Sequence, residues 1–172
     1  MLHLFEHGQR LRVVDMPGYG FSKTAPATRD GWDALMMTFF ESRAEAAAAG
    51  DASVLQTFVL VDCRRGLLDM DMHMLDLLAS FGLERTVVLT KADKLHRKQL
   101  DAVVHGTAMA LASTGHLEIR AEEILAAENG AEGYRYDSNG REASGEGGGL
   151  ILTSTKTNLG VGQLRARVMA PA

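Results

Sequence analysis

The sequence predicts an α/β fold of three layers, in which a mostly parallel sheet lies between helices. Short apolar segments alternate with longer segments of helical periodicity along the chain. One apolar segment, 58–61, is continuous, which is typical of a parallel strand buried on both faces. The 172 residues suit one domain, and an apolar content of 46% with 23% charged residues is ordinary for a globular protein.

The predicted elements follow in order along the chain. Strands are predicted at 2–5, 11–15, 54–62, 86–89 and 150–153. Apolar residues at helical spacing predict helices at 30–49, 69–80, 97–113 and 164–169. The predicted inward positions of the first three helices are Trp32, Leu35, Met36, Phe39, Phe40 and Arg43; Met70, Met74, Leu77, Leu78 and Phe81; and Leu100, Val103, Val104 and Met109.

One segment, 116–149, breaks this alternation. It combines a short helix-like piece, 121–127, with many glycines. Residues 118–146 hold eight acidic and three basic residues, a net charge of −5, so the rest of the chain carries +1 of the total of −4. We interpret 116–149 as an acidic, Gly-rich surface insertion in a body formed by 1–115 and 150–172. The near-neutral body argues neither for nor against nucleic acid as a partner.

Composition excludes several classes of protein. No apolar run approaches the roughly 18 residues of a membrane span, and residues 1–10 resemble neither a secretory signal nor a transit peptide. Cys63 is the only cysteine, so no internal disulfide can form, which fits a reducing compartment, and we expect Cys63 to be a buried, small hydrophobic residue. The six histidines lack the spacing of metal ligands.

Polar residues follow three of the predicted strands. They form the sequences Asp15-Met16-Pro17-Gly18, Thr90-Lys91-Ala92-Asp93 and Ser154-Thr155-Lys156. Taken alone, Asp15 suits a turn, and Lys91 with Asp93 suits a solvated loop. The carboxyl ends of parallel strands meet at one edge of a sheet, where α/β folds bind phosphates and metal ions. The three sequences together therefore predict a ligand site at that edge.

In this order the three sequences resemble the motifs of a GTPase G domain. The residues around them are similar to the EngB/YihA ribosome-biogenesis GTPases, from about residue 11 to 100 and again from 150 to 168. The resemblance is carried by Asp15-Met16-Pro17-Gly18-Tyr19-Gly20-Phe21, Asp62-x-Arg64-x-Gly66, Asp71-x-x-Met74 and Val88-Leu89-Thr90-Lys91-Ala92-Asp93-Lys94. It implies the three-layer fold of a P-loop NTPase G domain.

The resemblance also implies a bound guanine nucleotide, GTP or GDP, with Mg²⁺. Asp93 would accept hydrogen bonds from the ring N–H and exocyclic amine of guanine, a pair that adenine does not offer. The stem of Lys91 would lie over the base, with its ammonium group near the ribose or the phosphate loop. Asp15 would hold Mg²⁺ through a water molecule, and the Gly18 N–H would meet the γ-phosphate.

The remaining site residues follow from the same resemblance. Thr90 stands where most GTPases have Asn, a substitution that is usual in this family. The backbone N–H groups of Ser154 and Thr155 would meet the guanine carbonyl, in the sequence that ends at Lys156. Tyr19 occupies the usual water-orienting position, so no catalytic residue is identified. Slow intrinsic hydrolysis is expected, accelerated by a partner or by a monovalent cation such as K⁺.

The phosphate loop of such a protein is missing from the sequence. The motif G-x-x-x-x-G-K-[ST] does not occur in the 172 residues, and the first switch is also absent from them. In the family both precede the strand that ends at Asp15, and the phosphate-loop strand lies between the strands ending at Asp15 and Asp62. We therefore expect a G domain that is incomplete at its N-terminus and leaves two apolar strands with an unpaired edge. Such a chain should fold poorly alone.

The resemblance implies a GTPase that assists assembly of the large ribosomal subunit. Its partners would be rRNA, ribosomal proteins and other assembly factors, with no membrane and no DNA. The insertion suggests an organellar homologue in the mitochondrial matrix, with the cytoplasm as the alternative. Lys94, Arg97 and Lys98 form either a solvated helix start or a contact to RNA phosphate.

Two other functions remain open. A non-enzymatic pre-ribosome docking factor could keep the G-domain shape after losing nucleotide binding, and the missing phosphate loop favours it. An unrelated α/β enzyme would need a nucleophile or a metal cluster, which the sequence does not offer.

Overall fold

The computed structural model describes residues 3–8, 11–16, 18, 26–50, 56–117 and 148–169.

 Within these ranges, only the backbone is described for residues 7, 26–33 and 148. The chain divides into two compact units, Met1–Val54 with Ala172, and Leu55–Pro171.

The first unit contains a hairpin and a helix. Strands β1 (His3–His7) and β2 (Leu11–Asp15) pair antiparallel, with Phe5 opposite Val13. Helix α1 (Pro26–Ala48) begins four residues before the predicted start. Proline suits the first turn of a helix, because its fixed φ is helical and the N–H that it lacks would have no partner there.

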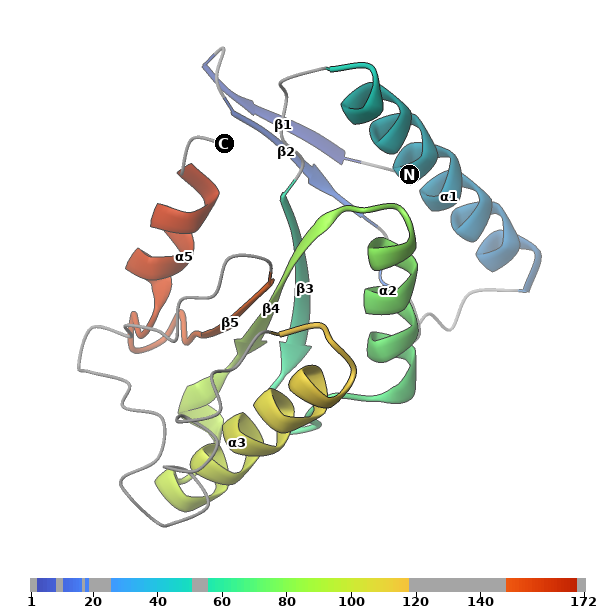
Figure 1. The fold of residues 1–172 in the computed structure, drawn as a ribbon. Coiled ribbons are helices and arrows are strands. Elements are labelled where there is room, and N and C mark those ends of the chain that lie inside the picture. Colours follow the sequence, from blue (N-terminus) through green and yellow to red (C-terminus); the bar gives the residue numbers. More distant parts are fainter. Residues whose placement is uncertain are drawn as a thin grey trace. The chain divides into compact units, whose positions relative to one another are not determined.

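The second unit is an α/β sheet. Strands β3 (Gln56–Asp62), β4 (Glu84–Thr90) and β5 (Gly148–Leu152) are parallel and lie in the order β3-β4-β5 (Figure 1). Helices α2 (Asp69–Ser80) and α3 (Arg97–Ser113) have the predicted bounds, and α5 (Val161–Met169) begins three residues before the predicted start. A short 3₁₀ helix, η1, spans Ala92–Lys94. The predicted α/β class with a parallel sheet is confirmed.

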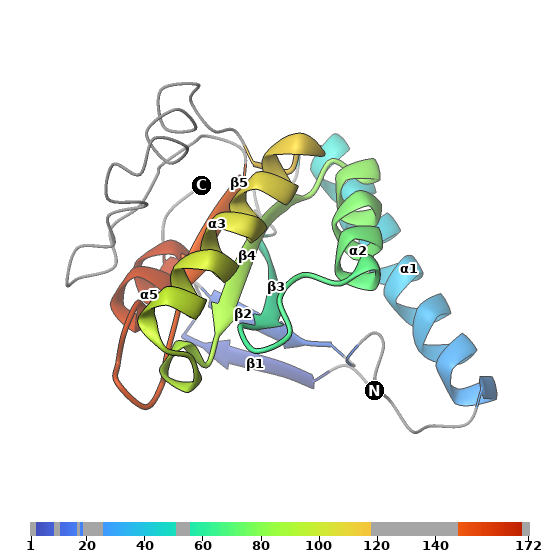
Figure 2. The same cartoon turned by 90° about the horizontal axis from the view of Figure 1, so that it is seen from below.

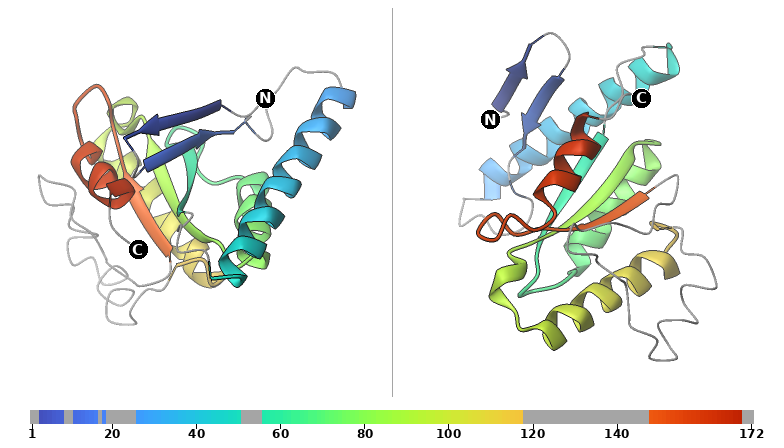
Figure 3. Two further views of the ribbon diagram at one scale, coloured as in Figure 1. Left: turned by 90° about the horizontal axis from the view of Figure 1, so that it is seen from above. Right: turned by 90° about the vertical axis from the view of Figure 1, so that its left-hand side faces the viewer.

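The core of this unit surrounds β4. Thr86, Val87, Val88 and Leu89 follow one another along β4 and are all at most 3% exposed, so both faces of the strand are covered. Helices α2 and α5 lie on opposite sides of the three strands (Figure 1, Figure 2 and Figure 3). An ion pair of 2.5 Å between Arg167 of α5 and Glu84 joins α5 to the start of β4.

The buried faces of the helices differ in part from the predicted ones. In α2 the fully buried side chains are Leu75 and Leu78, whereas Met70, Met74 and Leu77 are half-buried. In α3 the buried residues are Val104, Thr107, Ala108 and Leu111. The predicted Val103 and Met109 lie at the margin of this buried face and are half-buried.

The structure describes both ends of the segment 116–149, which we predicted to be an insertion. His116 and Leu117 are buried, and β5 begins at Gly148. The His116 ring accepts a hydrogen bond at Nδ1 from Arg85 Nε (3.1 Å) and lies 2.9 Å from Asp76 through Nε2. It joins the end of α3 to β4 and α2, so His116 belongs to the body. Residues 118–147, with the predicted helix at 121–127, lie outside the described residues.

Strand β3 lies at the edge of its sheet. Within the described ranges it pairs with β4 alone, and β1 with β2 forms a separate sheet. Val59 and Val61 are buried, whereas Leu60, on the other face of β3, is 64% exposed. No helix among the described residues is long and apolar enough to cross a membrane.

Candidate functional site

Polar residues meet at the carboxyl edge of the β3-β4-β5 sheet. Asp62 ends β3 and lies opposite Thr90, which ends β4. Leu89 lies opposite Leu152, so the residues after β5 emerge beside those after β4. This register confirms that the segments beginning at Thr90 and Ser154 share one edge, the position at which α/β sheets bind ligands.

Backbone hydrogen bonds hold the two loops together beyond the strand ends. The Thr153 N–H donates to Leu89 O (2.7 Å), and the Ala92 N–H donates to Thr153 O (3.1 Å). On the other side of β4, the Thr90 hydroxyl group donates to Val61 O (3.2 Å). Thr90 thus ties β4 to β3, and the loop that carries Asp93 is fixed from both sides.

Ser154 fixes the carboxylate of Asp93. Its hydroxyl group donates a hydrogen bond of 2.7 Å to Asp93 Oδ1, and its oxygen accepts the Thr157 N–H at 3.2 Å. The Ser154 residue is 1% exposed and the Asp93 side chain 10%. The Ser154 hydroxyl first, and more weakly the charges of Lys94 and Lys156, hold the pKa of Asp93 below its ordinary value. Asp93 is therefore an ionised acceptor.

The turn after β5 depends on a glycine. Gly160 has φ of 63°, and a Cβ there would lie 1.9 Å from Leu152 O. The Ser154 N–H donates to Leu159 O at 3.0 Å, which closes the turn. This differs from the prediction that the Ser154 N–H meets a ligand carbonyl, because that N–H is already used within the turn. Thr155 and Lys156 are exposed on the turn.

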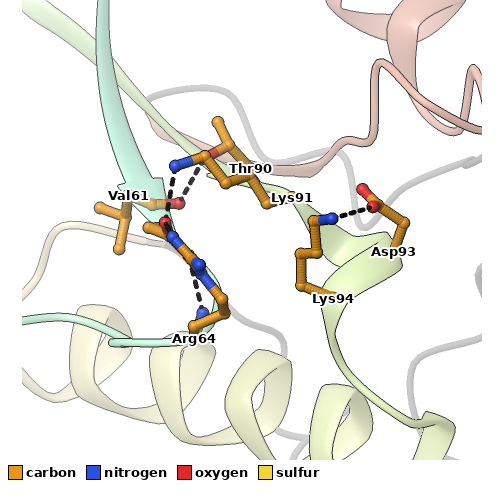
Figure 4. A network of polar contacts seen from close by, with 7 residues as sticks. Val61, Arg64, Thr90, Lys91, Asp93 and Lys94 are labelled. Carbon is orange, nitrogen blue, oxygen red and sulfur yellow. Dashed lines mark hydrogen bonds and ion pairs between the residues drawn. The ribbon is translucent and has the colours of Figure 1, made fainter.

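Lys91 turns back toward β3. Its backbone is left-handed, with φ of 61°, and its side chain is 53% exposed. The Lys91 ammonium group lies 2.8 Å from Asp62 Oδ2, and Arg64 grips the same carboxylate. Figure 4 shows Arg64 and Lys91 at the end of β3, with Lys94 facing Asp93 on the far side. Sequence reasoning gave Asp62 no role, although the parallel register places it beside Thr90.

The predicted phosphate and metal residues lie in the first unit. Asp15 is the exposed last residue of β2, and Gly18 is exposed. Tyr19 lies outside the described residues. Among the residues that the structure describes, no group of three or more His, Cys, Asp and Glu could hold a metal ion. Asp15 as a ligand of Mg²⁺ therefore stays a prediction.

Cys63 follows β3 and is fully buried. Burial, and then the negative charge of Asp62, raises the pKa of the Cys63 thiol to about 11. The thiol is therefore protonated at neutral pH and takes no part in nucleophilic chemistry. The prediction that Cys63 is a buried, small hydrophobic residue is confirmed.

The arrangement suits a planar ligand with paired N–H donors. One oxygen of Asp93 is oriented by Ser154, and the other lies 3.7 Å from the Lys94 ammonium group. A carboxylate oxygen accepts more than one hydrogen bond, so Asp93 retains capacity for a ligand. Lys91, Thr155 and Lys156 add exposed polar groups from the neighbouring loops.

No protein-family model matches the chain. Curated relatives do: the probable GTP-binding protein EngB of Rhodopseudomonas palustris (strain HaA2) is 37% identical over 105 residues, 61% of this chain and 45% of that protein. The protein of the same name from Caulobacter vibrioides is 33% identical over 111 residues, 64% of this chain and 45% of that protein. Over the matched residues, the chain is similar to these EngB proteins. The EngB match thus spans slightly less than half of these relatives' length.

A solved structure is similar to the chain at the level of the fold. The crystal structure of a probable GTP-binding protein engB aligns with 98% of this chain and 81% of its own, with a TM-score of 0.61 and 17% identity. The three parallel strands and their helices are therefore part of an EngB-like G-domain fold.

Proposed function

We propose that this chain binds the guanine nucleotides GDP and GTP at the carboxyl edge of the β3-β4-β5 sheet. The observation that supports this most directly is the Asp93 carboxylate, held by Ser154 and ionised. Guanine presents a ring N–H and an exocyclic amine side by side, and one carboxylate accepts both. Adenine lacks this pair, so a bound adenine would offer Asp93 no matching pair of donors. The names of the EngB relatives, which describe GTP-binding proteins, support the same proposal.

Other residues complete the proposed site. The Lys91 stem would cover one face of the base, and Thr155 with Lys156 would contribute from the turn after β5. Asp15 and Gly18, which belong to the first unit, remain the sequence-based candidates for contacts to the metal ion and the γ-phosphate. Mg²⁺, when bound, would offset the negative charge of the phosphates.

Exchanging the recognition carboxylate tests the proposal. In Asp93→Asn the side chain gains an amide donor, which suits xanthine because xanthine carries a carbonyl group where guanine has its amine. We expect GDP binding to weaken by roughly a hundredfold or more and xanthosine diphosphate binding to improve. Fluorescent nucleotide titration measures both. Asp101→Asn changes an exposed carboxylate on α3 and should change neither affinity. Equal GDP binding by wild type and Asp93→Asn would reject the proposal.

The proposed reaction is hydrolysis of GTP. Intrinsic turnover should be slow because Tyr19 occupies the water-orienting position, and a partner or a monovalent cation such as K⁺ should accelerate it. Phosphate release measured in Na⁺ and in K⁺ buffers tests this step separately from nucleotide binding.

We further propose a role in assembly of the large ribosomal subunit, in contact with rRNA, ribosomal proteins and other assembly factors. The family resemblance supports this role, and the acidic insertion supports a mitochondrial location. A tagged chain should co-sediment with large-subunit precursors in a gradient and co-localise with a mitochondrial marker. Recovery only in ribosome-free fractions would contradict the role.

A non-enzymatic docking factor is the second candidate. The absence of G-x-x-x-x-G-K-[ST] from the 172 residues favours it, since this motif cradles the phosphates in P-loop proteins. A docking factor would co-sediment with the precursor particle equally well with GDP, with GTP and without nucleotide. A nucleotide-controlled GTPase would change its binding to the particle between these conditions.

A further inference from the structure

The carboxylate of Asp62 joins two cations at the end of β3. Arg64 donates from Nε to Oδ1 (3.0 Å) and from Nη2 to Oδ2 (2.6 Å), and its backbone N–H also donates to Oδ1 (3.0 Å). The Lys91 ammonium group donates to Oδ2 (2.8 Å). The Asp62 side chain is 15% exposed, whereas those of Arg64 and Lys91 are each 53% exposed. The carboxylate is therefore the sheltered centre of the group.

The backbone on both sides of this contact is fixed. Asp62 and Thr90 are register partners, and the Cys63 N–H donates to Thr90 O at 3.0 Å, which extends the ladder past the strand ends. Lys91 then adopts its left-handed backbone. The distance between Asp62 and the Lys91 backbone is thus set by the sheet, and only the four-carbon stem of Lys91 can vary.

The charges keep the contact in place. Hydrogen bonds from Arg64 first, and then from Lys91, hold the pKa of Asp62 far below its ordinary value of 3.8, although partial burial opposes them. Asp62 is therefore ionised at neutral pH. Two cations share one carboxylate, which leaves the group with one net positive charge.

We propose that Asp62 is a positioning residue for nucleotide binding: it holds the Lys91 ammonium group, and Arg64 holds Asp62. This rests on the proposed function, in which the Lys91 stem covers the base. A half-exposed lysine has many rotamers, and ordering it on ligand binding costs affinity. Because Asp62 orders the Lys91 stem in the folded chain before the ligand arrives, part of this side-chain entropy is already lost on folding and does not weaken ligand binding.

A double-mutant cycle tests whether Asp62 acts through Lys91. The dissociation constant of a fluorescent GDP analogue is measured for the full chain, Asp62→Asn, Lys91→Met and the double variant. When Lys91 is present, we expect Asp62→Asn to weaken GDP binding by roughly three- to tenfold. In the Lys91→Met background, we expect the same substitution to weaken it by less than about twofold. An equal loss in both backgrounds would indicate a merely structural role and overturn the proposal, as would tighter binding by Asp62→Asn.

Two controls accompany the cycle. Asp69→Asn removes an exposed carboxylate at the start of α2 and should leave the affinity unchanged. If Asp62→Asn does not fold, Arg64→Gln replaces it, because that variant keeps Asp62 and Lys91 but loosens the grip on the carboxylate. Arg64→Gln should then weaken GDP binding, and only while Lys91 is present.

Chemical labelling separates this proposal from the proposed function. Without nucleotide, the acetylation rate of Lys91 relative to the exposed Lys98 is measured by mass spectrometry. We expect Asp62→Asn to raise this ratio by about twofold or more, since a lysine held by a carboxylate is less available. An unchanged ratio overturns the positioning role even if the chain binds GDP. A raised ratio in a chain that does not bind GDP rejects the proposed function alone.

Discussion

The Ser154 hydroxyl group lies 2.7 Å from Asp93 Oδ1 and joins two loops whose residues are 61 positions apart in the sequence. The Thr157 N–H occupies a lone pair of the same hydroxyl oxygen, so the Ser154 proton is directed to Asp93. The orientation of the recognition carboxylate is thus set by the turn after β5.

Removal of this hydroxyl group should weaken nucleotide binding without altering the fold. In Ser154→Ala, Asp93 loses the hydrogen bond that most lowers its pKa, and its carboxylate is free to rotate. We expect GDP affinity to fall by roughly tenfold, the usual effect of one hydrogen bond to a charged group. Ser113→Ala removes a hydroxyl that bonds only within the end of α3 and serves as the control. Unchanged affinity in Ser154→Ala would contradict the assigned role.

Acid should destabilise the chain through Asp62. Its folded-state pKa lies far below the ordinary 3.8, so the unfolded state takes up its proton first as the pH falls. The stabilising contribution is complete above about pH 5 and is lost progressively toward the folded-state pKa. Urea denaturation from about pH 5 to about pH 2 should show a shallower loss of stability for Asp62→Asn than for wild type. Parallel curves would contradict this.

Two glycines of the C-terminal region should respond oppositely to the same substitution. Gly160→Ala places a Cβ against Leu152 O at positive φ, and we expect a loss of more than about 2 kcal/mol in the free energy of unfolding. Gly162 lies within α5 with open space around its Cα, so Gly162→Ala should stabilise by about 0.5 kcal/mol. Chemical denaturation measures both, and similar values would show that the turn is not as constrained as described.

A matched pair of leucines tests the packing of the second unit. Leu75 of α2 is fully buried, so Leu75→Ala should lower the free energy of unfolding by about 2–5 kcal/mol. Leu60 of β3 is 64% exposed, and the same change there should cost about 0.5 kcal/mol or less. A large loss of stability in Leu60→Ala would mean that Leu60 is buried in solution.

The wild-type transition tests a separate prediction. A non-cooperative urea transition in the wild type would agree with the prediction that the 172 residues fold poorly alone.

Much of the second unit was predictable from local patterns. The bounds of α2 and α3 follow from apolar spacing between clear stop signals, and the buried strand β4 follows from its continuous apolar run. The start of β5 was missed because Gly148 and Gly149 have no side chains with which to form a pattern. His116 was assigned to the insertion because its partners, Arg85 and Asp76, lie 31 and 40 positions away.

The candidate site was predictable only in part. The order of the motifs, and the rule that the carboxyl ends of parallel strands share one edge of a sheet, predicted that Asp93 and Ser154 lie at the same edge. The contact between Asp62 and Lys91 depends on the register of β3 against β4, which local sequence does not encode. One signal was present: an acidic residue and an arginine two positions apart, directly after a buried strand, form a pair that can hold a third charged group.

The outer side of β3 has a practical consequence for handling the chain. Among the described residues β3 pairs with β4 alone, so the N–H and C=O groups along its other edge have no strand partner there, and Leu60 adds an exposed apolar side chain. Strands of this kind pair with copies of themselves in concentrated solution. The purified chain should therefore self-associate as its concentration rises, and Leu60→Lys, which adds charge at that position, should keep it monomeric to higher concentrations.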